Sequence, residues 1–134
     1  MNLKKKNPGK LFFALAVVMA LAFCNHALGQ DKSLVARMTK VRIDPMQLEF
    51  YKAALKTQIE TAVNEEQGVL TLYAVAEKSN PARITIFEVY ADEQAYKSHL
   101  ETAHFKKYKT ITKAMVKSSV LTACTPIALG AKAR

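Results

Sequence analysis

The stretch ITIFEVYADEQAYKSHLETAHF, residues 84–105, holds a strand, a helix cap and the starts of two helices in close succession. Residues 84–91 alternate as a strand does, with apolar side chains on both parities, which predicts that both faces of the strand are covered. Asp92 is a suitable N-cap for a short helix, and Thr102 is a suitable cap for a second helix, which we expect over residues 103–117. The stretch therefore predicts a strand followed by a helix in two pieces.

Three more strands and a long helix complete the pattern around this stretch. A helix is expected after Asp44 and Pro45, which suit the cap and the first helical position. The order β-α-β-β-α-β is that of an α+β, ferredoxin-like sandwich, in which a four-stranded antiparallel sheet carries the helices on one face. The four expected strands are Leu34 to Ile43, Val69 to about Lys78, Ile84 to Ala91 and Ser119 to Ile127.

The long helix has one apolar stripe and a glycine at its end. Its apolar residues recur at steps of three and four, which places them on one side of the helix. Gly68 is expected to end the helix by adopting a left-handed backbone. The stripe consists of Leu48, Tyr51, Leu55, Ile59 and Ala62.

The first 29 residues have the layout of a secretory signal peptide. Four lysines precede an apolar run over residues 11–23, and Ala27 to Gly29 offer small residues before a cleavage site. The run is shorter than the roughly 20 residues that span a bilayer. We expect an exported protein, periplasmic or secreted, whose single domain is residues 30–134 with a core over about 34–127. Lipid attachment at Cys24 is the less favoured alternative, because Phe23 stands where that signal needs a small residue.

Charge and cysteine content narrow the function classes. The formal charge of +9 includes the four lysines of residues 1–29, which contain no acidic residue, so the remaining chain carries 16 basic and 11 acidic residues, or +5. This modest excess in an exported protein argues against a nucleic-acid partner. Cys124 is the one cysteine after residue 29, which excludes an intrachain disulfide there. We interpret it as an inert core thiol.

The sheet is predicted to have more apolar surface than the helices can cover. Strand 69–78 is apolar on both parities, and Phe87 and Val89 lie on the side of their strand opposite Ile84 and Ile86. Helices cover one face only, and an uncovered apolar face is a binding surface. We therefore expect a homodimer that packs sheet to sheet.

Glu88 and Tyr90 alternate along their strand with Phe87 and Val89. If Phe87 and Val89 face the second subunit, Glu88 and Tyr90 point toward the helices. A carboxylate there needs a partner or has to be neutral, and His99 and His104 are the nearest candidates along the chain. In one unbroken helix their five-residue spacing separates the two side chains by about 140°. A bend at Thr102 would instead let both imidazoles converge on one cavity.

The stretch FEVYADEQAYKSHLETAHFKKYKTI resembles the antibiotic biosynthesis monooxygenase (ABM) domain family, and in particular its quinol monooxygenase-like members. Glu88, His99 and His104 match the glutamate and the two histidines of that family's motif, and Tyr90 stands where the family has tryptophan. Ala103 replaces the usual proline. The stretch EEQGVLTLY is similar to the family's passage from helix to second strand, with Gly68 and Tyr73 in matching places. The tyrosine at position 90 argues against the haem-degrading branch, where the indole helps to distort the haem.

The resemblance implies a dimeric α+β barrel with a pocket between sheet and helices in each subunit. It also implies oxidation of a small quinol or phenolic substrate by molecular oxygen, with no metal, flavin or haem cofactor. An ionised quinol is electron-rich enough to reduce oxygen, so the protein has to take a proton and hold the anion. On this hypothesis His99 is the base or oxyanion partner and Glu88 orients or charges it. Tyr73, Tyr90 and His104 shape the polar side of the cavity.

Two other functions stay open at this point: a non-catalytic dimeric module that binds a small ligand, and an isomerase or decarboxylase on the same fold. A metal site is disfavoured, because His99, Glu101 and His104 lack the spacing of a ligand set. Four lysines step by three or four residues along the last expected helix, which is typical of a solvated face; they are Lys106, Lys109, Lys113 and Lys117.

Overall fold

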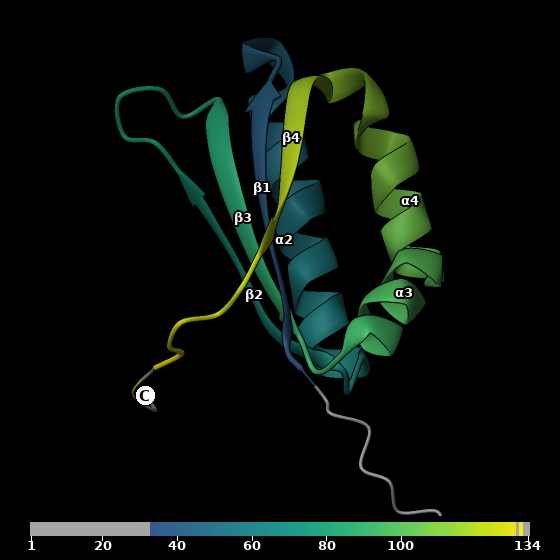
Figure 1. Cartoon of the computed structure of the whole chain (residues 1–134). Coiled ribbons are helices and arrows are strands. Elements are labelled where there is room, and N and C mark those ends of the chain that lie inside the picture. The colour runs from purple at the N-terminus through teal and green to yellow at the C-terminus, as the bar shows by residue number, and fades with distance from the viewer. Residues whose placement is uncertain (1–32, 131, 133–134) are drawn as a thin grey trace, which may run out of the picture. The chain divides into compact units, whose positions relative to one another are not determined.

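Alternating apolar residues place four strands of the described chain in one antiparallel sheet. The computed structural model describes residues 33–130 and 132, so the expected signal peptide lies outside the described residues. Figure 1 shows the order of the elements. They are β1 (Val35–Ile43), a 3-10 turn (Pro45–Gln47), α2 (Leu48–Glu65), β2 (Val69–Ala76), β3 (Arg83–Tyr90), α3 (Glu93–Glu101), α4 (Ala103–Thr112), a second 3-10 turn (Lys113–Met115) and β4 (Val116–Cys124).

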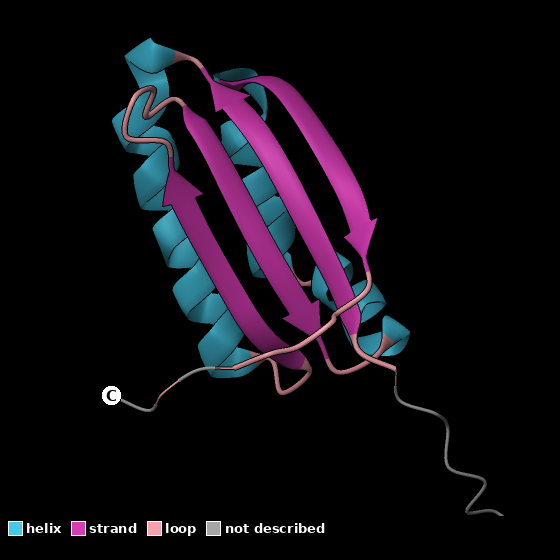
Figure 2. Cartoon of the chain, turned by 60° about the vertical axis from the view of Figure 1, so that its left-hand side comes forward, coloured by secondary structure: helices cyan, strands magenta, loops and turns pink. Residues whose placement is uncertain are grey.

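The ferredoxin-like α+β prediction is confirmed. Strand β1 pairs antiparallel with both β3 and β4, and β2 pairs antiparallel with β3. Within the part of the chain that the structure describes, helices α2, α3 and α4 lie on one face of the sheet, and the other face carries no helix (Figure 2). Among the described residues, no helix is long and apolar enough to cross a membrane.

The helix face of the sheet and the stripe of α2 form the core. Tyr51, Leu55 and Ala62 of α2 are buried, and Leu48 and Ile59 pack against the same core from its margin. Strands β1, β2 and β3 supply apolar side chains to this core; they include Val41, Ile43, Leu72, Ile84 and Ile86. The predicted stripe is therefore confirmed.

The opposite face of the sheet is only partly covered. The chain after β4 turns across one end of this face (Figure 2), where Ala36 and Val89 pair with each other and are buried. Farther along the face Tyr73, Val75 and Val120 remain exposed. Strand alternation thus leaves an apolar surface that no described helix covers.

Gly68 does not have the left-handed backbone that we expected, since no glycine among the described residues has a positive φ. The helix instead ends through Glu66, whose extended backbone turns the chain while its N–H still bonds to Ala62. Gly68 is needed for a different reason: a Cβ at this position would overlap the Cβ of Ala95 on α3. A close approach between two segments, rather than a special dihedral angle, explains this glycine.

The last helix ends earlier than the sequence predicted, because pairing with β1 draws the chain into a strand. α4 ends at Thr112, and Val116 already pairs with Ile43. Lys117 therefore belongs to β4 rather than to a helical lysine stripe, and its Nζ lies 2.7 Å from a carboxylate oxygen of Asp44.

Candidate active site

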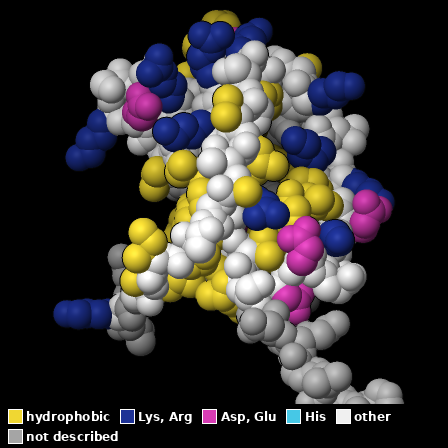
Figure 3. All heavy atoms as spheres, in the orientation of Figure 1, with side chains coloured by type: hydrophobic (Ala, Val, Ile, Leu, Met, Phe, Trp, Pro, Cys, Tyr) yellow, Lys and Arg dark blue, Asp and Glu magenta, His cyan; other side chains and the backbone are white. Residues whose placement is uncertain are grey.

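Glu88 of β3 lies on the helix face of the sheet, beside a cavity of about 740 Å³ between the sheet and helices α3 and α4. Side chains of the sheet and of helices α2, α3 and α4 line this cavity, and most of these side chains are apolar. Lining residues include Thr39, Ile86, Leu100, Phe105 and Leu121. In the space-filling view hydrophobic side chains gather in the middle of this side of the molecule, and lysines and arginines line its upper margin (Figure 3). The cavity has the size and apolar lining of a small-molecule site.

Burial raises the pKa of the Glu88 carboxyl to about 7, against its ordinary value of 4.5. The positive charges of Arg37 and Lys109 oppose this rise and hold the pKa near neutrality. Arg37 is the cross-strand neighbour of Glu88 on β1. A carboxyl group with such a pKa is suited to exchange protons at neutral pH.

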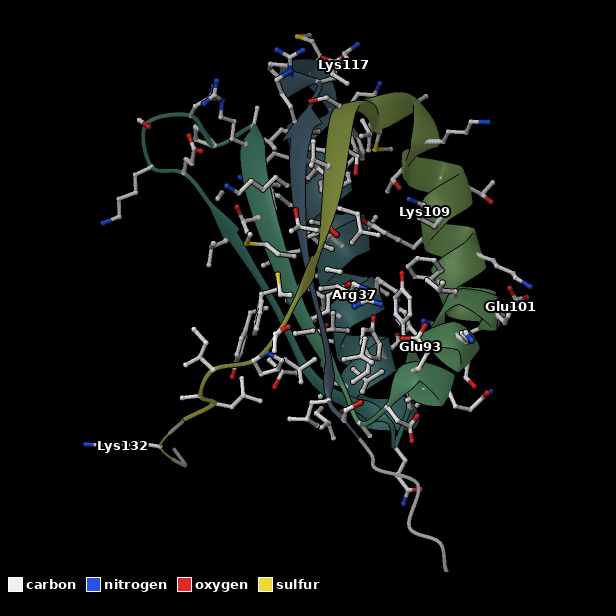
Figure 4. The ribbon with its side chains drawn as sticks, in the orientation of Figure 1. Arg37, Glu93, Glu101, Lys109, Lys117 and Lys132 are labelled. Atoms are coloured by element: carbon white, nitrogen blue, oxygen red, sulfur yellow. The ribbon has the colours of Figure 1, made fainter. Side chains whose placement is uncertain are left out.

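Arg37 is itself fixed by groups on α3. Its guanidinium lies 3.5 Å from the carboxylate of Glu93 and 4.7 Å from the ring centre of Tyr96. Figure 4 shows Arg37 and Glu93 close together between the sheet and α3, with Lys109 on α4. The cation and the ring attract each other because the ring face is negative. Arg37 therefore lies behind Glu88, paired with Glu93, whereas Lys109 is itself one of the residues that line the cavity.

Two tyrosines add hydroxyl groups to the cavity wall. The hydroxyls of Tyr51 on α2 and Tyr108 on α4 are hydrogen-bonded to each other at 2.8 Å, and both residues line the cavity. Burial raises the pKa of each phenol, so both remain protonated at neutral pH. Such a pair can donate a hydrogen bond to an oxygen atom of a bound molecule.

A second polar group lies in the interior, and we call it the Glu66 cluster: Glu66, Gln58, His99 and His104. Glu66 stands at the end of α2, and its Oε1 lies 2.8 Å from Nδ1 of His99 and 3.0 Å from Nε2 of His104. His104 Nδ1 is 2.8 Å from Gln58 Oε1. His99 is 1% exposed, whereas the side chains of Glu66 and His104 are 14% and 21% exposed.

The two histidines meet because the chain bends at Thr102. The Thr102 side chain accepts a hydrogen bond from the Phe105 N–H and donates one to the carbonyl of His99, so α4 starts in a new direction. The imidazole centres are 6.1 Å apart. The helix start expected at Thr102 is confirmed, but the two imidazoles converge on Glu66, and neither lines the cavity beside Glu88.

Tyr90 of β3 lies between the cavity and the Glu66 cluster. It is fully buried, and its ring centre is 5.4 Å from that of His99 and 5.2 Å from that of Tyr96. Its hydroxyl has no hydrogen-bond partner among the described residues. A buried hydroxyl without a partner costs free energy, so its presence needs an explanation.

The sequence profile of the family described as antibiotic biosynthesis monooxygenase matches residues 34–110, which is more than half of the chain. The chain belongs to this family. A candidate ABM protein of Bacteroides thetaiotaomicron, known from a crystal structure, is 50% identical to it, with a TM-score of 0.72 over 76% of this chain and 97% of the other. A comparison with curated proteins gave no match.

Two further solved structures are similar to this ABM chain. A candidate monooxygenase of Lactobacillus acidophilus is 30% identical, with a TM-score of 0.67 over 69% of this chain and 44% of the other. A candidate ABM protein of Nitrosomonas europaea is 15% identical, with a TM-score of 0.67 over 72% and 92% of the two chains. At that identity the last comparison shows the fold alone.

The partner of His99 in this ABM protein differs from the one we expected. Glu88 was expected to meet a histidine, but the carboxylate bonded to His99 comes from Glu66, and the described contacts include no hydrogen bond from Glu88 to either histidine. The reason is the bend at Thr102, which turns both imidazoles toward the end of α2. Glu66 lies in the stretch EEQGVLTLY, which is similar to the family's passage from helix to second strand, but no pattern in the sequence predicts its contact with His99.

Tyr73 does not share the cavity of Glu88. It pairs with Phe87 across β2 and β3, on the open face of the sheet, and is 62% exposed. Strand alternation gives Leu72 the place on the helix face instead. The prediction that Tyr73 shapes the polar side of this cavity is wrong, and Tyr90 and His104, for which the same role was predicted, are also not among the residues that line it.

Several residues of the candidate site were not predicted from the sequence to belong to it. Gln58 carried a signal, because it is a polar residue between Leu55 and Ala62 on the apolar stripe and is buried. Tyr51 was assigned to the core, and Arg37, Tyr108 and Lys109 were not singled out for the site. No group of three or more histidine, cysteine or acidic side chains within residues 33–130 is arranged to hold a metal ion.

Proposed function

We propose that this protein is a cofactor-independent monooxygenase that oxidises a small quinol or phenol with molecular oxygen in the cavity beside Glu88. The observation that carries the proposal is a partly buried carboxyl group whose pKa is raised to about 7 and which borders a mostly apolar cavity. Family membership supports the monooxygenase class, and the cavity chemistry supports the substrate class.

Glu88 is the proton acceptor in this proposal. The carboxylate takes the hydroxyl proton of the bound phenol, which leaves an electron-rich phenolate. Lys109, which lines the cavity, stabilises that anion by its positive charge, and the one hydroxyl of the Tyr51–Tyr108 pair that does not donate to the other can donate a hydrogen bond to its oxygen. His99 is enclosed by the Glu66 cluster and so acts behind the cavity rather than as the first base.

The substrate itself supplies the electrons. One atom of molecular oxygen enters the ring to give a quinone, and the other leaves as water, so a phenol provides all four electrons that the oxygen molecule accepts. No external reductant is needed for this balance. The protein's part is to ionise the ring, hold it and exclude water.

An oxygen electrode with a panel of phenols and reduced quinones tests the proposal. We expect oxygen uptake above the uncatalysed rate, together with incorporation of one heavy-isotope oxygen atom into the quinone when labelled oxygen gas is used. A wild-type protein that binds these compounds but consumes no oxygen would contradict the proposal and favour a ligand-binding module. Conversion without oxygen would favour the isomerase or decarboxylase alternative.

We also propose that the open sheet face joins two copies of the chain. Tyr73, Val75 and Val120 are exposed on this face, which supports burial against a second apolar sheet. Sedimentation equilibrium is expected to give twice the chain mass at micromolar concentration. Val75→Lys places a charge in the expected contact and should shift the protein toward the monomer, and a wild-type monomer would refute the interface.

Export remains a proposal that rests on the sequence of residues 1–29. We expect the mature protein to begin at Gln30. Amino-terminal sequencing of the protein from its native cell fraction tests this, and an intact Met1 in the cytoplasm would contradict it.

A further inference from the structure

Two lysines line the cavity beside Glu88, and neither forms an ion pair with an acidic side chain of the described residues. Lys109 lies on α4 (Figure 4), and Lys113 follows it by four residues, about one helical turn, at the start of the second 3-10 turn. Lys106 and Lys117, which belong to the same predicted stripe, each pair with a carboxylate instead. The stripe expected as a solvated face thus contains two paired lysines and two lysines that border the cavity.

Lys113 and Glu88 belong to opposite ends of this cavity. β3 ends just after Glu88, at the end of the sheet where α3 begins, whereas Lys113 lies in the turn that joins α4 to β4 at the other end (Figure 1). The register gives the separation: Glu88 is four residues from Ile84, and Ile84 stands in one row with Val41 and Ser119. Four residues of a strand span about 13 Å. Two chemical groups of one bound molecule can therefore be recognised separately.

The end of the cavity near Lys113 has a second polar group. Ser119 of β4 lines the cavity there, and its hydroxyl can donate a hydrogen bond. Glu88 is the one acidic side chain among the described residues that line the cavity, and it lies at the far end. An ammonium group beside a hydroxyl, away from any carboxylate of the cavity wall, suits a negatively charged group.

The proposed reaction leaves positive charge in the cavity to be balanced. Once Glu88 has taken the substrate proton it is neutral, while Lys109 and Lys113 each keep one positive charge. The phenolate balances Lys109, whose charge already acts on the Glu88 carboxyl. The charge of Lys113 then has no counterion among the described residues of the wall. A second negative charge on the substrate, at the end away from the reacting hydroxyl, supplies one.

We propose that the cavity binds phenols or quinols that carry an anionic side chain, and that Lys113 and the Ser119 hydroxyl hold the anionic group. This inference rests on the proposed function, because it names the substrate class of the same site. Lys113 determines specificity in this arrangement and takes no part in the chemistry at the hydroxyl. A lysine presents a point charge, so the distance between ring and anion decides the fit more than the shape of the anion does.

Binding of 3-(4-hydroxyphenyl)propionate and of its neutral amide, measured by calorimetry without oxygen, tests the anion site. The two compounds have nearly the same shape and differ by one charge. The wild type should bind the acid about fivefold more tightly, which is the upper range for an ion pair at a partly exposed position. The preference should shrink as salt is added. 4-Hydroxybenzoate, whose carboxylate is attached directly to the ring, should show a smaller preference over its own amide.

Lys113→Gln should abolish the preference for the acid and leave the affinity for the amide unchanged, whereas Lys113→Arg keeps the charge and should keep the preference. Lys107→Gln is the matched control, because it removes the same charge from an exposed position of α4 that does not line the cavity. In turnover, Lys113→Gln should raise KM for the phenolic acid about fivefold without changing kcat. Both constants for a neutral phenol should stay as in the wild type.

The outcomes separate the two proposals. A preference for the acid that is lost in Lys113→Gln, without oxygen uptake on any substrate, would refute the monooxygenase and leave the anion site standing. Equal affinities for acid and amide in the wild type would refute the anion site alone. A preference that survives in Lys113→Gln, or that disappears in Lys107→Gln as well, would also refute it, because the net charge of the protein would then attract the anion.

Discussion

Replacing Glu88 with glutamine is expected to lower kcat for phenol oxidation by about two to four orders of magnitude, which is the range of general-base contributions. The amide keeps the size of the side chain but cannot accept the proton that activates the substrate. The KM should change little, because the apolar walls and the tyrosine pair remain. Initial rates of oxygen uptake measure both constants.

Glu101→Gln is the matched control for this substitution. This substitution also replaces glutamate with glutamine, but at an exposed position, where the carboxylate pairs with Lys106. Its kcat should equal that of the wild type. A Glu88→Gln variant with wild-type kcat would remove Glu88 from the mechanism and return attention to His99.

Glu88→Gln is also expected to be more stable than the wild type at neutral and alkaline pH. The pKa of Glu88 is about 7 in the folded chain and 4.5 ordinarily, so between these values the unfolded chain holds fewer protons and the wild type loses stability as pH rises. Glutamine does not titrate. The difference in free energy of unfolding should vanish near about pH 4 and approach at most about 3 kcal/mol above about pH 7.

Urea unfolding of both proteins over this pH range measures the effect. A stabilised but inactive variant would show that the carboxyl group is kept for its chemistry at a cost in stability. Equal stability at every pH would mean that the Glu88 carboxylate is better solvated than its partly buried position indicates.

Gly68→Ala is expected to destabilise the fold by about 1–3 kcal/mol, the usual cost of an extra methyl group in a packed contact. The new Cβ would overlap that of Ala95, and the two backbones are tied together nearby, because the Ala91 N–H donates to the Gly68 carbonyl at 2.9 Å. The start of α3 would have to move away from β2. Denaturant unfolding measures the loss.

A compensating variant makes this test specific. Ala95→Gly alone should cost about 1 kcal/mol of helix stability, yet in the Gly68→Ala background it should recover part of the loss, because it removes the overlapping atom. Gly130→Ala is the control, since no atom lies within 4 Å of a Cβ there. Additive losses in the double variant would show that the contact does not limit the approach of the two segments.

Periodicity and caps determined most of the fold. The alternation in β3, the stripe of α2 and the side-chain caps at Asp92 and Thr102 are local patterns, so they could be interpreted without knowing any partner. The position at which α4 ends is not determined by a local sequence pattern. Residues 113–117 look helical in isolation, but residues 113–115 form a 3-10 turn, and pairing of Val116 with Ile43 places the residues after them in β4.

The sequence by itself determined the order of elements, the side of β3 from which Glu88 and Tyr90 project, and the bend that brings His99 and His104 together. Only the tertiary structure decided that Glu66 is the carboxylate that meets those imidazoles. It also decided that Tyr73 lies on the open face of the sheet, and that residue 68 is glycine because Ala95 packs against it. The physical reason is distance along the chain: Glu66 and His99 are 33 residues apart, and no local pattern encodes a contact whose geometry depends on how α2 and α3 pack on one sheet.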